Sequence, residues 1–127
     1  MSRPVHFEIL ADDPARAVAF YEAALGWKIQ PMGEVDRTQG AAPYWLADTG
    51  PGEMGINGAI KEREPAGQTT IITIGVGDLE ATLESIRMAG GRADSPIDDI
   101  PNIGRFTYAF DTEGNALGVL QPLPREG

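Results

Sequence analysis

The sequence predicts an α+β fold made of two copies of one module, each a strand followed by a helix and three further strands. Two stretches superpose without a gap when the chain is shifted by 65 residues, which indicates an internal repeat. Each stretch begins with an extended apolar segment and continues with a helical pattern that starts after an aspartate and ends at a glycine. The superposed residues are Phe7, Ile9, Asp13, Val18, Tyr21 and Gly26 on Ile72, Ile74, Asp78, Leu83, Ile86 and Gly91.

The first copy opens with a period of two. Residues 5–9 alternate between apolar and polar side chains, which predicts a strand with His6 and Glu8 on one face and Val5, Phe7 and Ile9 on the other. A helix is expected after Asp13, because its carboxylate can accept the free backbone N–H groups of the first turn. Gly26 ends this helix where a left-handed residue is easiest.

The second copy repeats this order. Residues 69–76 are rich in β-branched side chains and predict a strand, and Asp78 is placed to cap the following helix. Glycines 90 and 91 close that helix. We expect the two helices to cover the sheet faces that bear Phe7 with Ile9 and Ile72 with Ile74, which leaves His6 and Glu8 inside the curved sheet.

Three short strand signals follow each helix, at residues 27–29, 44–47 and 56–60, and at residues 92–93, 105–110 and 116–121. The polar segment 61–68 holds Pro and Gly and is predicted to connect the modules. Module 1 then covers about residues 4–60 and module 2 about residues 69–123 of a single domain, 1–127. Asp98 and Asp99 are expected in a solvated loop.

The composition excludes several classes of protein. The chain has 127 residues, no cysteine and one histidine, which excludes disulfides, thiolate metal sites and a cysteine nucleophile. Its 10 Lys+Arg against 19 Asp+Glu give a net charge of −9, which opposes nucleic-acid binding. The N-terminus has no apolar signal core and no apolar run reaches membrane length, so we expect a cytoplasmic protein with no membrane partner.

Several motifs resemble those of the vicinal oxygen chelate superfamily, which holds glyoxalase I, bleomycin-resistance proteins and extradiol dioxygenases. The resemblance spans residues 4–122. It implies two βαβββ modules in one cup-shaped mixed β-sheet, and it does not fix the reaction. The motifs are His6-Phe7-Glu8-Ile9, Asp12-Asp13-Pro14, Arg16-Ala17, Phe20-Tyr21, Leu25-Gly26-Trp27, Gly77-Asp78-Leu79, Gly90-Gly91 and the segment 110–115.

The resemblance also implies where a divalent metal would be held in active members. His6 matches the histidine of the family's first strand, and its counterpart in module 2 is Ile71. The ligand positions of the last strands fall on Gly58 and Gly118. One donor out of four does not make a metal site, so no metal or other cofactor is assigned and glyoxalase I activity itself is not expected.

The candidate ligand-binding residues are those expected on the inner face of the cup: His6, Glu8, Trp45, Asn57, Phe106 and Tyr108. Each has a structural alternative. His6 could be a satisfied inward-facing side chain, and Glu8 a partly solvated acid at the rim. Tyr44 and the other aromatic residues could fill the core, Asn57 could satisfy a backbone group, and Arg105 could be a surface residue.

Three functions remain open at this level. The first is a small-molecule-binding protein with an incomplete metal site. It would form a homodimer and bind a small organic molecule, for which an aromatic compound is one candidate. The second is a metal-dependent lyase, isomerase or dioxygenase with a divalent metal in a site rebuilt around His6, Glu8 and Asn57. The third is an accessory domain that acts through contacts with another protein.

Overall fold

Eight strands form one mixed sheet in the order β2-β3-β4-β1-β5-β8-β7-β6. The computed structural model describes residues 2–37, 40–64 and 67–124. For residues 33–37 and 40–42 it describes the backbone only. The elements are β1 (Arg3–Ala11), α1 (Pro14–Leu25), β2 (Lys28–Arg37), β3 (Gly40–Asp48), β4 (Gly58–Glu62), β5 (Thr70–Gly75), α2 (Leu79–Met88), β6 (Asp98–Ile100), β7 (Gly104–Phe110) and β8 (Ala116–Pro122).

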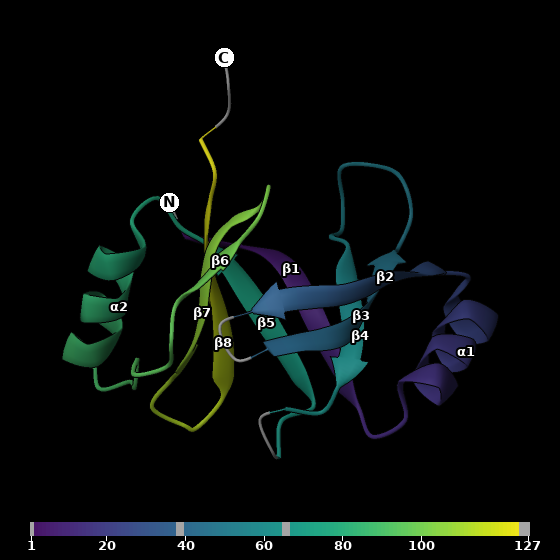
Figure 1. The fold of residues 1–127 in the computed structure, drawn as a ribbon, viewed down its shortest axis with the longest axis horizontal. Helices are drawn as coiled ribbons and strands as arrows, with labels where there is room; N and C mark the ends of the chain where they lie inside the picture. Colours follow the sequence, from purple (N-terminus) through teal and green to yellow (C-terminus); the bar gives the residue numbers. More distant parts are fainter. Residues whose placement is uncertain (1, 38–39, 65–66, 125–127) are drawn as a thin grey trace.

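The sheet has two halves with the same internal order, joined by β1 and β5. Strand β1 pairs in parallel with β4, β5 pairs in parallel with β8, and the central β1–β5 pair is antiparallel. Phe7 lies opposite Ile72, and the shift of 65 residues carries one onto the other, so this pair marks a pseudo-two-fold axis. The sheet curls into a half-barrel (Figure 1), which confirms the predicted two-module α+β fold.

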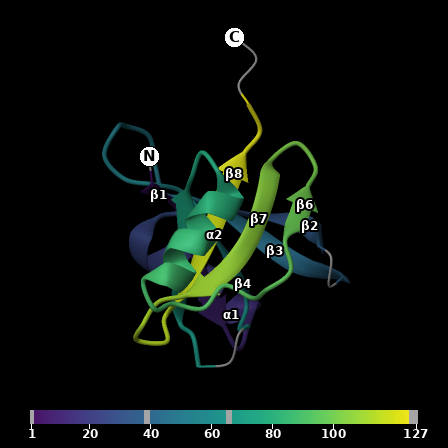
Figure 2. The same cartoon turned by 90° about the vertical axis from the view of Figure 1, so that its left-hand side faces the viewer.

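The two helices lie at opposite ends of the molecule (Figure 1), and α2 runs beside β7 and β8 (Figure 2). Each helix covers its own apolar cluster on the outer face of the sheet. A single module of about 60 residues would bury too little surface to be stable alone, so the shared sheet joins the two. A third cluster lies on the inner face. Leu79, Leu83 and Val119 belong to the cluster under α2, Ala47 and Ile60 to the cluster under α1, and Leu10, Ile71 and Ala116 to the inner cluster.

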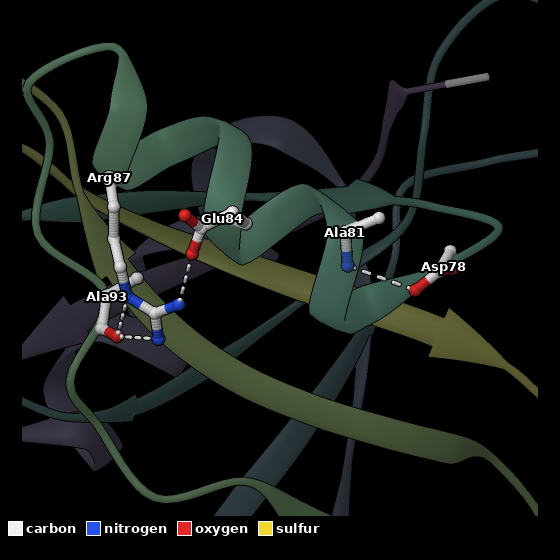
Figure 3. A network of polar contacts seen from close by, with 5 residues as sticks. All are labelled: Asp78, Ala81, Glu84, Arg87 and Ala93. Atoms are coloured by element: carbon white, nitrogen blue, oxygen red, sulfur yellow. Dashed lines mark hydrogen bonds and ion pairs between the residues drawn. The ribbon is translucent and has the colours of Figure 1, made fainter.

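Both helices begin at the predicted aspartates. Asp13 Oδ1 accepts a hydrogen bond from Arg16 N at 3.1 Å, and Asp78 Oδ1 accepts one from Ala81 N at 3.0 Å (Figure 3). Gly26 caps the end of α1 with a left-handed backbone, φ 72°. The local signals therefore place both helix starts as the sequence predicts.

The end of α2 is tied to the loop that follows it. The Arg87 guanidinium donates hydrogen bonds to the carbonyl oxygen of Ala93, the shorter at 2.6 Å, and to Glu84 at 3.3 Å (Figure 3). The strand predicted at residues 92–93 is only an isolated bridge between Arg92 and Phe110.

Two predicted loops are wrong in part. The segment 61–68 was expected to be a linker, but β4 continues to Glu62 and buries Lys61, which is 7% exposed; residues 65–66 lie outside the described residues. Asp98 was expected in solvent, but it begins β6 and is 4% exposed. Aspartate is a poor strand former, and pairing with β7 overrides that local preference.

The alternation of β1 is interrupted at Val5. The register shifts between Pro4 and His6, so Val5 does not share the outer face with Phe7 as the period of two predicts. Ile72 lies on the outer face but is 46% exposed, because it sits on the pseudo-two-fold axis between the areas that the helices cover.

The register of β4 predicts the effect of a methyl group at Gly58. This glycine lies opposite Phe7, and a Cβ there would overlap the Phe7 ring. Gly58→Ala should lower the free energy of unfolding by about 1–3 kcal/mol, measured by urea unfolding. Gly77→Ala, which has no atom within 4 Å of the added carbon, is the matched control and should change it by less than about 0.5 kcal/mol. Equal stability of the two variants would contradict this register.

Candidate functional site

A cavity of about 320 Å³ opens on the inner face of the half-barrel. Its wall is mostly apolar and its floor, on β1 and β5, is polar. The apolar lining residues are Val5, Met32, Leu46, Ile100, Ile103, Phe106 and Leu120, and the polar ones are His6, Glu8, Tyr44 and Thr73. Side chains of the inner cluster fill the rest of the inner face, so the cavity occupies only part of the cup.

Glu8 lies at the centre of the floor and is 1% exposed. Tyr44 Oη donates to Glu8 Oε2 at 2.8 Å, and Tyr108 Oη donates to Glu8 Oε1 at 2.6 Å. A carboxyl group taken out of water is costly unless such donors replace the solvent. Glu8 is therefore a buried, fully engaged group and not a partly solvated acid at the rim.

Lys61 extends this network on the side of β4. Its Nζ donates to Tyr108 Oη at 3.3 Å and lies 5.5 Å from the centre of the Tyr108 ring. Tyr108 thus accepts from an ammonium group while it donates to Glu8, which links a cation to the carboxylate through one hydroxyl.

His6 joins this network through the hydroxyl group of Tyr44. Its Nε2 lies 2.9 Å from Tyr44 Oη, and the two rings are stacked with an interplanar angle of 12°. Because the single hydroxyl proton of Tyr44 is donated to Glu8, we infer that His6 Nε2 carries a proton and donates it. Burial lowers the pKa of His6 from 6.5, and the nearby Glu8 offsets part of this effect, so the imidazole is neutral at pH 7.

Thr73 completes the floor. It lies opposite His6 in the β1–β5 pair, is 2% exposed and lines the cavity. Its Oγ1 is buried and has no hydrogen-bond partner within the described part of the chain. Buried hydroxyl groups are almost always hydrogen-bonded, so this atom is an exception that needs an explanation.

The cup does not offer the donors of the family's metal site. Ile71 is completely buried opposite Glu8, and Gly118 lies opposite Thr73. The repeat relates Thr73 to Glu8, and the residue opposite Glu8 in β4 is Ala59. Ala59 is therefore the counterpart of Gly118 in the first module. The predicted counterpart, Gly58, was wrong, because it faces Phe7 on the outer side of the sheet.

Among the residues that the structure describes, no three His, Asp or Glu side chains converge as a metal ion requires. Both carboxylate oxygens of Glu8 and the Nε2 of His6 are already engaged by tyrosine hydroxyls. The residues present therefore do not fit a divalent metal held in the manner of the family.

Equivalent positions on the two sides of the pseudo-two-fold axis differ in polarity. Strand register makes Leu46 the equivalent of Tyr108, because they lie opposite Ala59 and Gly118. Two residues before Leu46 and Tyr108 lie Tyr44 and Phe106, which are therefore equivalent. Two residues after Ala59 and Gly118 lie Lys61 and Leu120, which are equivalent in the same way. In three pairs the polar member comes from module 1 and its apolar equivalent from module 2: His6 with Ile71, Tyr44 with Phe106, and Lys61 with Leu120. The pair of Leu46 and Tyr108 has the opposite order.

The predicted candidates divide into two groups. The cavity is lined by His6, Glu8 and Phe106. Tyr108 does not line it but donates a hydrogen bond to Glu8. Two others were misplaced: Trp45 packs against the outer cluster under α1, and Asn57 is exposed and accepts a hydrogen bond from Thr49 N. Arg105 is paired with Glu80 away from the cavity.

Sequence reasoning gave no role to Thr73 or Lys61 and named Tyr44 only as one aromatic residue among several. The repeat contained a signal for Thr73, because the shift of 65 places it on Glu8. The period of two contained one for Tyr44, since adjacent strand residues face opposite sides and only one of Tyr44 and Trp45 could face the cup.

The buried carboxyl group predicts the cost of losing a hydroxyl donor. Tyr108→Phe should lower the free energy of unfolding by about 1.5–3 kcal/mol, because Glu8, which is 1% exposed, loses a hydrogen bond to its carboxyl group. Tyr21→Phe, on α1 and remote from Glu8, is the control and should change it by less than about 0.5 kcal/mol. Urea unfolding measures both. A cost for Tyr108→Phe no larger than the control would show that this contact does not stabilise the fold.

The lowered pKa of His6 predicts a pH effect with a definite sign. Below pH 6.5 the unfolded chain binds a proton at this residue before the folded chain does, so protonation favours unfolding and stability falls as the pH falls. The stability difference between the wild type and His6→Gln should therefore decline from pH 7 to pH 5, by at most about 1.4 kcal/mol per pH unit. A difference that is constant or grows on acidification would contradict it.

Comparisons with known proteins agree with this fold. Residues 3–119 match the model of the Glyoxalase/Bleomycin resistance protein/Dioxygenase superfamily. The chain is 32% identical over 120 residues to the "Putative glyoxylase CFP32" of Mycobacterium bovis. The aligned region covers 94% of this chain but 44% of that protein, so this chain spans less than half the length of that relative. It is also 32% identical over 119 residues to a glyoxylase-like domain-containing protein of Didymella fabae, covering 88% of each.

Solved structures show the same architecture. A variant of methylmalonyl-CoA epimerase from Streptomyces coelicolor, in complex with 2-nitronate-propionyl-CoA, superposes with a TM-score of 0.67 at 20% identity and covers 98% of this chain and 97% of the epimerase. Neither helix in the described part of this chain has the length and apolar character needed to cross a membrane. The family match over nearly all of the described residues, together with the two-module cup, shows that the chain belongs to the glyoxalase/bleomycin resistance protein/dioxygenase superfamily, the vicinal oxygen chelate proteins.

Proposed function

We propose that this chain binds a small organic molecule in its cup and does so without the divalent metal of the family. The observation that carries the proposal is the cavity itself, which combines an apolar wall with a floor of buried polar groups. Such a combination is typical of small-molecule sites, where apolar surface supplies affinity and a few polar groups fix orientation. A cup filled by side chains would instead have favoured an accessory domain that acts only through protein contacts.

The size of the cavity limits the ligand. An apolar cavity of about 150 Å³ holds one benzene ring, so about 320 Å³ is room for a compact two-ring molecule or one of similar volume. The rings of Tyr44 and Phe106 occupy equivalent places on the two sides of the cup and offer surfaces for a planar ligand. We therefore expect an aromatic or similarly flat ligand.

The epimerase neighbour supports a ligand in this cup but not the same ligand. Its structure contains a coenzyme A thioester analogue, which carries phosphate groups. None of the described residues that line the present cavity is Lys or Arg, and the chain carries a net charge of −9. An anionic ligand would find no cationic partner in that lining, so the proposal is restricted to uncharged molecules.

A homodimer is also part of the proposal. Phe20 and Leu25 on α1 and Ile72 at the pseudo-two-fold axis are 59%, 57% and 46% exposed, and apolar side chains at a surface favour association. The cytoplasmic location expected from the sequence stays a prediction.

A neutral fluorescent probe tests the site. The neutral two-ring probe 1-naphthylamine should bind with one site per chain and with blue-shifted emission, in protein purified without an affinity tag and equally well with EDTA present. Leu46→Arg places a charge at the apolar rim and should weaken binding about tenfold, because the probe cannot solvate it. Met54→Arg, at a side chain that is 98% exposed, adds the same charge outside the cavity and should leave binding unchanged.

Three results would count against the proposal. Equal effects of Leu46→Arg and Met54→Arg would place the probe outside the cup. Loss of binding with EDTA, or stoichiometric Ni, Zn, Fe or Mn in the protein that disappears in His6→Ala, would favour the metal-dependent enzyme with a site rebuilt around His6 and Glu8. Absence of saturable binding would remove the evidence for a ligand site altogether.

A further inference from the structure

Among the described residues, one buried polar side-chain atom of the cavity floor has no hydrogen-bond partner. Thr73 Oγ1 is buried, lines the cavity and has no hydrogen-bond partner within the described residues. Leaving a buried hydroxyl unpaired is unfavourable, and valine would fill the same space without that penalty. A threonine at this position therefore needs a reason beyond packing.

The polar groups closest along the floor are already engaged with one another. The Tyr44 and Tyr108 hydroxyl protons are donated to Glu8, and His6 Nε2 is directed to Tyr44. This closed set satisfies the carboxylate from both sides, whereas Thr73 stands outside it. The hydroxyl group of Thr73 is thus a buried donor of the floor that lacks an acceptor among the described residues.

The strand beside Thr73 leaves room for its hydroxyl. Gly118 on β8 lies directly opposite, and a Cβ there would be 2.6 Å from Thr73 Oγ1 and 2.9 Å from Phe106 Cε2. Any larger residue would push the hydroxyl or the Phe106 ring aside. The glycine keeps a hydrogen-bond donor and an aromatic surface together on one side of the cavity.

The surroundings decide which acceptor is favoured. The described lining residues include Glu8 and no Lys or Arg, so a carboxylate or phosphate would meet a buried acid without a compensating cation. A carbonyl oxygen is an uncharged acceptor and carries no such penalty. The rest of the lining near Thr73, including Phe106 and Leu120, suits an apolar body.

From these observations we infer that Thr73 is the ligand's hydrogen-bond donor, and that the cup selects neutral molecules with a carbonyl oxygen on an apolar, ring-sized body. This inference rests on the proposed function and makes it more specific. The Thr73 hydroxyl group would donate a hydrogen bond to the carbonyl oxygen of the ligand, and the apolar wall would pack against the ligand's ring.

A matched pair of ligands tests the inference. Benzophenone and diphenylmethane have nearly the same size and differ in a carbonyl group against a methylene group. Competition with 1-naphthylamine should show that wild-type protein binds benzophenone about fivefold to tenfold more tightly than diphenylmethane, the effect expected of one hydrogen bond. Thr73→Val should bind the two equally while keeping the affinity for diphenylmethane, and Thr73→Ser should retain the preference.

The outcomes separate the inference from the proposed function. If wild-type protein binds both compounds equally, or if Thr73→Val keeps the preference for benzophenone, the role of Thr73 is wrong although the cup still binds ligands. If the preference is lost in Thr73→Ser as well as in Thr73→Val, the hydroxyl is not the determinant. If neither compound displaces the probe, both the inference and the proposed function are overturned.

Discussion

The inner face of this protein depends on the burial of one carboxyl group. Glu8 is 1% exposed, and its two oxygens accept hydrogen bonds from Tyr44 on β3 and Tyr108 on β7, which belong to different modules. The pair of contacts therefore ties the two halves of the sheet together across the pseudo-two-fold axis. It also fixes the roles of the neighbours, because the direction of the Tyr44 hydroxyl requires His6 to donate from Nε2, and Tyr108 is left to accept from Lys61.

A repeat of two similar modules would give a cup with matching sides, yet several equivalent positions of this cup differ in polarity. His6, Tyr44 and Lys61 come from module 1, while their equivalents Ile71, Phe106 and Leu120 come from module 2. Two pairs differ from these three. Leu46 and Tyr108 have the opposite order, and Glu8 and Thr73 are both polar and buried, although only Thr73 lacks a partner among the described residues. The described residues that line the open cavity therefore present a mostly apolar wall and one buried hydroxyl group without a partner.

The fold was predictable because its signals are local or periodic. Asp13 and Gly26 mark a helix by their own chemistry, and the shift of 65 residues relates the modules without knowledge of any contact. The errors arose where a distant strand decides the environment. Lys61 looks like a linker residue until Tyr108 is placed beside it, and Asp98 looks solvated until β7 pairs with it. The site was predicted only in part, since Trp45 was predicted as a ligand-binding residue, whereas alternation along β3 places its neighbour Tyr44 in the cup.

The missing metal ligands have a chemical consequence for what this cup can do. A divalent ion binds and strongly polarises a carbonyl oxygen, whereas one hydroxyl group orients the oxygen with the energy of an ordinary hydrogen bond. The polar residues that could have acted as ligands, His6 and Glu8, are instead committed to Tyr44 and Tyr108. Freeing either for coordination would leave a buried acid short of a donor or a tyrosine short of its partner, so the network resists conversion into a metal site. The described residues therefore favour recognition of an oxygen-bearing ligand over its activation by a metal.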